Sequence, residues 1–362
     1  MSAGQWFPLV PWPRPPGEKL ATRIERITTA AQTVRCGEPS DAVAAAAQVY
    51  NGAALIASDV GLPELARDWC WEHARLYLAH LPLDARMAQR ALEPVVNLAR
   101  LQIRAGEGGA AFGMLTALRE GVRTAASIVI DGHELPLDRL IASEEDRAEL
   151  YRWVWTVCLG DGTRALASQG QWSRAAEHAQ QHMGVGERLF DGRQAAVIAE
   201  LVGGAPEAAL ALVEGSAVQE PWERAVQRVL ALWCRVEAGG VEDGEAATVL
   251  QRVRVAQEGR VVFRTRLGIA AIEVAGGLSE EAGPLVAPVV SAVIQERDGY
   301  AVRDVLRAWE DRLPQDSRAA LRTVLDESGL DSGVLQEMPL QALTESLQEA
   351  HGRLSGADLL LM

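Results

Sequence analysis

The chain has 362 residues, 48% hydrophobic and only 5% aromatic, which suits either two domains or one elongated array of repeats. It carries 35 lysines and arginines against 49 aspartates and glutamates, and the net charge of -14 opposes binding to nucleic acid or to anionic membranes. Lys19 is the only lysine, which excludes Schiff-base chemistry from the body of the protein and is typical of a GC-rich genome.

The four cysteines predict a reduced, cytoplasmic protein. Cys36, Cys70, Cys158 and Cys234 lie far apart and form no C-x-x-C pair, so we expect buried thiols rather than disulfides. The N-terminus shows no basic stretch followed by an apolar core, and no apolar run reaches about 18 residues. We therefore expect neither a signal peptide nor a membrane span.

Residues 1–17 are predicted to form an extended arm. Trp6, Phe7 and Trp12 alternate there with prolines, which prevent a helix and favour a polyproline-like strand of chain. Exposed tryptophan is costly in water, so we expect a strap whose aromatic side chains pack on the first helices. The alternative is a recognition tail that inserts into a groove, either its own or that of a partner.

Residues 18–312 are predicted to alternate between helices and turns, because apolar residues recur at spacings of three and four. The first helices after the turn at 36–41 are expected at 42–58, 64–80, 84–105 and 109–126. A β-branched run before Asp131-Gly132 predicts an irregular insertion at about 127–147, extended or folded as a small hairpin. Residues 313–362 are expected to form a C-terminal helical cap.

A repeat underlies this pattern. Five glycines each close one apolar segment, and an alanine five residues later opens the next. The pairs are Gly61/Ala66, Gly106/Ala111, Gly170/Ala175, Gly204/Ala209 and Gly277/Ala282, and Gly240 marks a further turn. A period in the thirties with small residues at the turns predicts an all-α solenoid of stacked antiparallel helical hairpins.

The segments resemble tetratricopeptide (TPR) repeats. The best match is Asn97-Leu-Ala-Arg-Leu-Gln-Ile-Arg-Ala-Gly106, and the second is Leu166-Ala-Ser-Gln-Gly-Gln-Trp-Ser-Arg-Ala-Ala-Glu-His-Ala179. The other repeats depart from the pattern: Glu200 and Glu273 stand where an aromatic residue is usual, and the late proline is mostly missing. The resemblance covers about two thirds of the chain and implies a TPR-like α-solenoid that binds a peptide or protein segment in a concave groove.

Within this register, polar residues on the first helix of each hairpin are expected to face the groove. They are Gln48, Asn51, Glu93, Asn97, Arg100, Arg104, Asp161, Arg164, Asp191, Gln194 and Arg264. A side-chain amide holds a peptide backbone by offering a donor and an acceptor together, and arginine pairs with carboxylates through two hydrogen bonds. The alternative interpretation is that these residues form ordinary solvated helix faces.

Catalytic and metal-binding signatures are weak. His178 and His182, four residues apart, would face one metal only with a third ligand that the sequence does not supply, so we expect no metal. No nucleotide- or cofactor-binding motif is present, and we expect no cofactor. The nearest acid–base pair is His133 and Glu134 in the insertion.

Three hypotheses about function follow. The first is a cytosolic TPR-like adaptor, an accessory or regulatory factor of a bacterial peptide-processing or signalling system, with the arm as lid or anchor. The second is an all-α enzyme with a site built from His133, Glu134 and neighbouring helices. Those helices would contribute Asp161, Arg164, His178 and Arg193. The third is a structural homodimer that associates through apolar terminal helices.

Overall fold

The computed structural model describes residues 3–13, 15–240, 248–249, 251, 260–276 and 283–356. It is 73% helical, with 15 α-helices and one two-stranded sheet in this described part, so the protein is all-α. The chain divides into two compact units. Unit 1 contains residues 1–18 and 162–328, and unit 2 contains residues 19–161 and 329–362.

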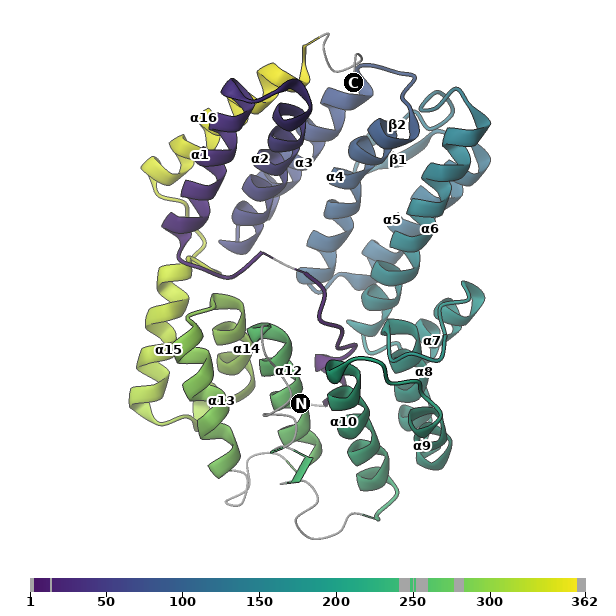
Figure 1. The fold of residues 1–362 in the computed structure, drawn as a ribbon, viewed down its shortest axis with the longest axis vertical. Coiled ribbons are helices and arrows are strands. Elements are labelled where there is room, and N and C mark those ends of the chain that lie inside the picture. The colour runs from purple at the N-terminus through teal and green to yellow at the C-terminus, as the bar shows by residue number, and fades with distance from the viewer. Residues whose placement is uncertain are drawn as a thin grey trace. The chain divides into compact units, whose positions relative to one another are not determined.

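Unit 2 contains six whole helices, a hairpin and the first part of a seventh helix, α6 (Glu144–Ala167) (Figure 1). The whole helices are α1 (Leu20–Cys36), α2 (Pro39–Asp59), α3 (Pro63–Leu78), α4 (Ala85–Arg104), α5 (Gly108–Thr124) and α16 (Glu337–Leu354). The first five pack on one another in chain order, whereas α16 returns from the C-terminal part of the chain to lie along α1 and α2. Helix α6 contains the boundary between the units.

Unit 1 is built from the arm and the later helices. They are η1 (Ala3–Trp6), α7 (Trp172–Gln181), α8 (Asp191–Val202), α9 (Pro206–Glu214), α10 (Pro221–Glu237), α12 (Val261–Val274), α13 (Gly283–Glu296), α14 (Gly299–Trp309), η2 (Glu310–Arg312) and α15 (Gln315–Ser328). Here too, consecutive helices pack on one another. The segment expected as a cap, 313–362, supplies α15 to unit 1 and α16 to unit 2.

The glycines of the repeat end their helices in the same way. Gly61, Gly106, Gly170 and Gly204 all have φ between 67° and 89°, the left-handed conformation that costs glycine little. In each case the next residue donates its N–H to the carbonyl five residues earlier, as in a Schellman turn. These bonds are Leu62 to Ala57, Glu107 to Gln102, Gln171 to Leu166 and Ala205 to Glu200.

One expected turn is displaced by a residue. Gly239, with φ of 73°, takes the left-handed conformation, and Gly240 donates to Arg235. Gly277 and Ala282 lie outside the described residues. The other paired alanines are fully buried, which lets the helices approach closely, as the repeat pattern predicts; they are Ala66, Ala111, Ala175 and Ala209.

The insertion is a β-hairpin of β1 (Ile128–Ile130) and β2 (His133–Leu135), paired antiparallel. Asp131 and Gly132 both have positive φ, 51° and 76°, as a tight two-residue hairpin turn requires. Arg67 of α3 pairs with Asp131 at 3.0 Å, and the Trp71 ring lies 4.4 Å from that of His133. The β-branched run and the Asp-Gly pair therefore predicted this local structure correctly.

Candidate functional site

The N-terminal arm lies against helices of unit 1 that are far from it in sequence. The side chains of Trp6, Phe7 and Leu9 are buried, and the centre of the Phe7 ring lies 5.9 Å from that of the tilted Trp233 ring on α10. The Trp6 indole donates to Glu273 Oε2 on α12 at 3.0 Å. The arm is therefore a strap that packs on α8, α10 and α12 of unit 1, whereas the sequence led us to expect packing on the first helices.

The arm is fixed at its other end by Gly17. Its N–H donates to Asp298 Oδ2 at 2.9 Å, and its carbonyl accepts from the N–H of Gly299 at 2.7 Å. Asp298 also caps α14 by accepting from the N–H of Tyr300. A Cβ added at Gly17 would lie 2.8 Å from Asp298 Oδ1 and from the Tyr300 nitrogen, so only glycine allows this close approach.

Gln194, one of the predicted groove residues, holds the middle of the arm. Its Oε1 accepts from the N–H of Leu9 at 2.7 Å, and its Nε2 donates to the carbonyl of Leu9 at 2.9 Å. Nε2 also donates to the carbonyl of Leu189 at 2.7 Å. The amide therefore binds both main-chain groups of one residue of an extended segment, which is the interaction expected of a peptide-binding side chain.

Arg164 and Asp191, two further groove candidates, meet at Trp12. The Arg164 guanidinium forms a two-pronged pair with Asp191, with Nη2 at 3.0 Å from Oδ2 and Nε at 3.2 Å from Oδ1. The same guanidinium lies over the Trp12 ring, 5.5 Å from its centre. The Trp12 indole N–H donates weakly to Asp191 Oδ2 at 3.4 Å. Two paired charged groups, one on α6 and one on α8, thus converge on a half-exposed tryptophan.

Trp12 begins a line of four aromatic rings, here called the aromatic row: Trp12, Phe190, Trp222 and Phe263. Successive ring centres are 6.4, 5.9 and 6.2 Å apart. Trp12 is 51% exposed and Phe190 37%, Trp222 is partly exposed, and Phe263 is buried. The row therefore runs from the surface of unit 1 into its core.

A second arginine supports the row. The Arg188 guanidinium lies 4.7 Å from the centre of the Phe190 ring and pairs with Glu223 at 2.8 Å. Burial acts to raise the pKa of Glu223, but hydrogen bonds from Arg188 and from the N–H groups of Gln219 and Glu220 outweigh it and lower that pKa. Glu223 therefore stays ionised and neutralises Arg188.

Other candidate residues form a polar row in unit 2, across α2, α4 and α6. Asn97 Nδ2 donates to Asn51 Oδ1 at 3.1 Å, and Arg100 Nη1 donates to Asn97 Oδ1 at 3.1 Å. Arg100 Nε donates to the buried Asp161 at 2.9 Å. One turn further along α4, Arg104 pairs with Asp59 at 3.5 Å. The polar row below means Asn51, Asn97, Arg100, Arg104 and Asp161.

The remaining candidates lie apart from both rows. Glu93 on α4 is partly exposed; burial raises the pKa of Tyr77, and the Glu93 carboxylate adds a smaller rise. Arg264 on α12 pairs with Glu296 of α13 at 3.0 Å. Gln48 is exposed on α2.

The proposed acid–base and metal residues have structural partners. His133 contacts Arg75 at 3.3 Å, and Arg193 donates to the carbonyl of Leu212 at 2.8 Å. His178 is buried, with its ring 4.7 Å from that of His182. Within the residues that the structure describes, no three histidine, cysteine or carboxylate side chains gather as a metal site would require.

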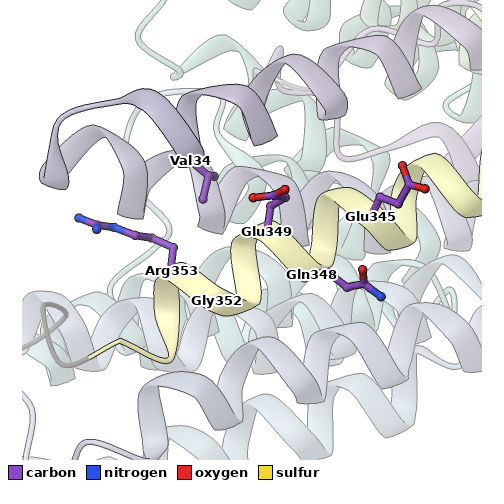
Figure 2. A pocket seen from close by; sticks show the side chains of 6 residues that line it. All are labelled: Val34, Glu345, Gln348, Glu349, Gly352 and Arg353. Atoms are coloured by element: carbon purple, nitrogen blue, oxygen red, sulfur yellow. The ribbon is translucent and has the colours of Figure 1, made fainter.

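Two pockets in unit 2 flank α16. The larger, about 520 Å³, is lined by Val34, Glu345, Gln348, Glu349, Gly352 and Arg353 (Figure 2). Figure 2 shows Glu345 and Glu349 on the side of α16 that faces Val34, whereas Gln348 points the other way. The smaller, about 320 Å³, is lined by Trp69, Glu72, Thr344, Leu347, Gln348 and His351. His133 lines neither of them.

Glu273 binds the arm through Trp6 but was not among the residues predicted to bind a segment. Burial raises its pKa, and the hydrogen bond from Trp6 opposes that rise. The sequence contains a signal for it, because Glu273 replaces the aromatic residue usual at that repeat position. A carboxylate on an otherwise apolar helix face indicates a specific polar partner. Nothing in the local sequence says that this partner is Trp6.

Among the described helices, none combines the length and apolar character needed to cross a membrane. Comparison of the chain with protein-family models, with curated proteins and with solved structures finds no match in any of the three.

Proposed function

We propose that the protein is a TPR-like adaptor that binds an extended peptide or protein segment of a partner through polar residues on its helical hairpins. The observation that carries this proposal is the pair of hydrogen bonds between the Gln194 amide and the main chain of Leu9. It supports the proposal because main-chain recognition by a helix-borne amide is independent of the bound sequence and therefore suits a general segment-binding scaffold.

The polar row of unit 2 is the proposed site for the partner. Arg100 donates hydrogen bonds to Asp161 and Asn97, whereas a guanidinium offers five N–H donors. Its side chain is 43% exposed and that of Arg104 is 40% exposed. Asp161 and Asn97 hold the guanidinium in place, so less side-chain entropy is lost when a carboxylate or carbonyl binds to it.

The same proposal places the protein in the reducing cytoplasm as an accessory factor rather than an enzyme. All four cysteines are free thiols, three of them buried, which suits such a compartment. Burial raises the pKa of Cys70 to about 12 and that of Cys234 to about 11, so neither thiol is a nucleophile at neutral pH.

The test is a screen of displayed random twelve-residue peptides against the full-length protein, followed by fluorescence anisotropy of the selected peptides. We expect the double change Asn97→Ala, Arg100→Ala to weaken binding by about tenfold or more, as loss of a charged hydrogen bond predicts. Arg100→Lys keeps a positive charge beside Asp161, so we expect this variant to fold normally but to bind the peptides more weakly than the wild type.

Arg123→Ala is the matched control, because it removes an exposed arginine of unit 2 that pairs with Glu120 on the same helix. It should leave binding unchanged. A screen without any saturable ligand would remove the proposed function. Ligands that bind equally to the wild type and to the folded double variant would exclude the polar row.

A further inference from the structure

We propose that the aromatic row of unit 1 is a docking surface for a proline-rich segment of a partner protein. The inference rests on the proposed function, because it assigns a second segment-binding surface and its ligand class. It is carried by three observations: the spacing of the rings, the neutralised arginines beside them, and the way the chain's own proline-rich arm lies there.

The spacing of the rings matches the polyproline II helix. Ring centres along Trp12, Phe190 and Trp222 are 6.4 and 5.9 Å apart. A polyproline II segment rises about 3.1 Å per residue, so every second residue advances by about 6.2 Å. Proline rings at alternate positions would therefore each meet one aromatic ring.

The exposure of the rings is unusual for aromatic side chains of this size. Trp12 is 51% exposed and Phe190 37% exposed, although both touch other rings. By contrast Trp6 and Phe7 of the same arm are 6% and 5% exposed. The first part of the arm is therefore core, whereas Trp12 contributes to a surface. A cluster of exposed aromatic rings indicates an interaction site.

Charge selects among the ligands for such a surface. Arg164 lies over Trp12 and is paired with Asp191. Arg188 lies over Phe190 and is paired with Glu223. Asp191 is 7% exposed and Glu223 fully buried, so these carboxylates face inward and cancel the arginine charge. An acidic segment would gain little Coulomb energy here, which favours a neutral segment that binds through ring packing.

The arm already places proline residues at the exposed end of the row. Pro11 and Pro13 flank Trp12, and Pro13, Pro15 and Pro16 are all exposed. Proline-rich chain is already extended before binding, so it loses little conformational entropy when it packs on aromatic rings. A partner's proline-rich segment would pack across Phe190 and Trp222.

The experiment measures fluorescence anisotropy of a labelled decaproline peptide with the full-length protein, and compares a glycine–serine peptide of equal length. We expect saturable binding of decaproline only. Trp222→Leu keeps an apolar side chain but removes the flat ring, and should weaken binding by about tenfold. Trp222→Phe restores a ring and should bind within about threefold of the wild type.

Val202→Ala is the control, because it shortens a 62% exposed apolar side chain elsewhere in unit 1 and should leave binding unchanged. Affinity should change little with added salt, because the row is neutral. Absence of decaproline binding by the wild type would overturn the inference, as would tighter binding of a decaglutamate probe. Equal decaproline affinity of Trp222→Leu and the wild type would also overturn it.

Failure of this inference is distinguishable from failure of the proposed function. Selected twelve-residue peptides that bind with Asn97 and Arg100 intact but without dependence on Trp222 would support the adaptor and overturn the proline-rich ligand. Decaproline binding lost in Trp222→Leu, in a protein that selects no other peptide, would support the aromatic row alone.

Discussion

The side-chain amide of Gln194 is hydrogen-bonded to both main-chain groups of Leu9, 185 residues earlier in the chain. Gln194 has no exposed surface, so the pair lies in the core of unit 1. Gln194 was predicted to bind a segment of a partner protein, and it binds the chain's own arm instead. Binding and folding use the same chemistry here, because an extended segment leaves main-chain groups that must find partners.

Replacing Gln194 by glutamate tests this pair. Gln194→Glu removes the N–H₂ group that donates to Leu9 and Leu189 and buries a carboxylate near their carbonyl oxygens. We expect a loss of about 3 kcal/mol in unfolding free energy, measured by urea denaturation, and faster proteolysis of the arm. Gln180→Glu, on the exposed face of α7, should change neither. An arm that stays equally protected in Gln194→Glu would contradict this account.

Glu273 predicts a pH dependence of the arm's attachment. Burial raises its pKa above the ordinary 4.5, so the folded protein binds more protons than the unfolded chain between 4.5 and the raised value. Its stabilising contribution is therefore complete below pH 4.5 and declines as pH rises through the folded pKa. We expect the difference in unfolding free energy between the wild type and Glu273→Gln to fall across this window and then level off. A difference that does not vary with pH would show that Glu273 has an ordinary pKa.

Asp59 in unit 2 is predicted to matter more than its exposed partner. It binds the buried Arg23, and more loosely Arg104 at 3.5 Å. Asp59→Ala removes the carboxylate that pairs with Arg23, which is 4% exposed, and should cost about 3–5 kcal/mol. Arg104→Ala should cost less than about 1 kcal/mol, because that pair is partly solvated. Chemical denaturation measures the unfolding free energy of both variants, and equal losses of unfolding free energy would contradict this ranking.

His73 predicts acid sensitivity in unit 2. It is 1% exposed, stacks on Tyr50 with ring centres 4.8 Å apart and lies 5.4 Å from the tilted Tyr77 ring. Burial lowers its pKa from 6.5 to about 3. The unfolded chain binds the proton more readily, so this contribution is present above pH 6.5 and is lost as pH falls toward 3. The loss should approach about 1.4 kcal/mol per pH unit within that window.

His73→Phe should remove that slope while keeping the stacked ring. Urea denaturation at pH values about one unit apart, from about 4 to about 7, measures the slope of the unfolding free energy against pH. The control is His351→Gln, which changes an exposed histidine. NMR titration of the His73 ring near pH 6.5 in the folded protein would contradict the prediction.

The sequence alone determined those features that depend only on residues close together along the chain. Gly61, Gly106, Gly170 and Gly204 end helices because a left-handed residue is cheapest for glycine, and Asp131-Gly132 turns the hairpin for the same local reason. The all-α class follows from apolar spacing. These signals act within about six residues, so no knowledge of the rest of the chain is needed.

Only the tertiary structure decided which distant segments meet. Trp6 binds Glu273 across 267 residues, and α16 lies on α1 and α2 from the opposite end of the sequence. Arg164 and Asp191 were candidates for a partner, yet they meet each other beneath Trp12. Such contacts are chosen by burial and hydrogen bonding summed over whole units, because many helix faces have similar apolar patterns and only the packed structure selects among them.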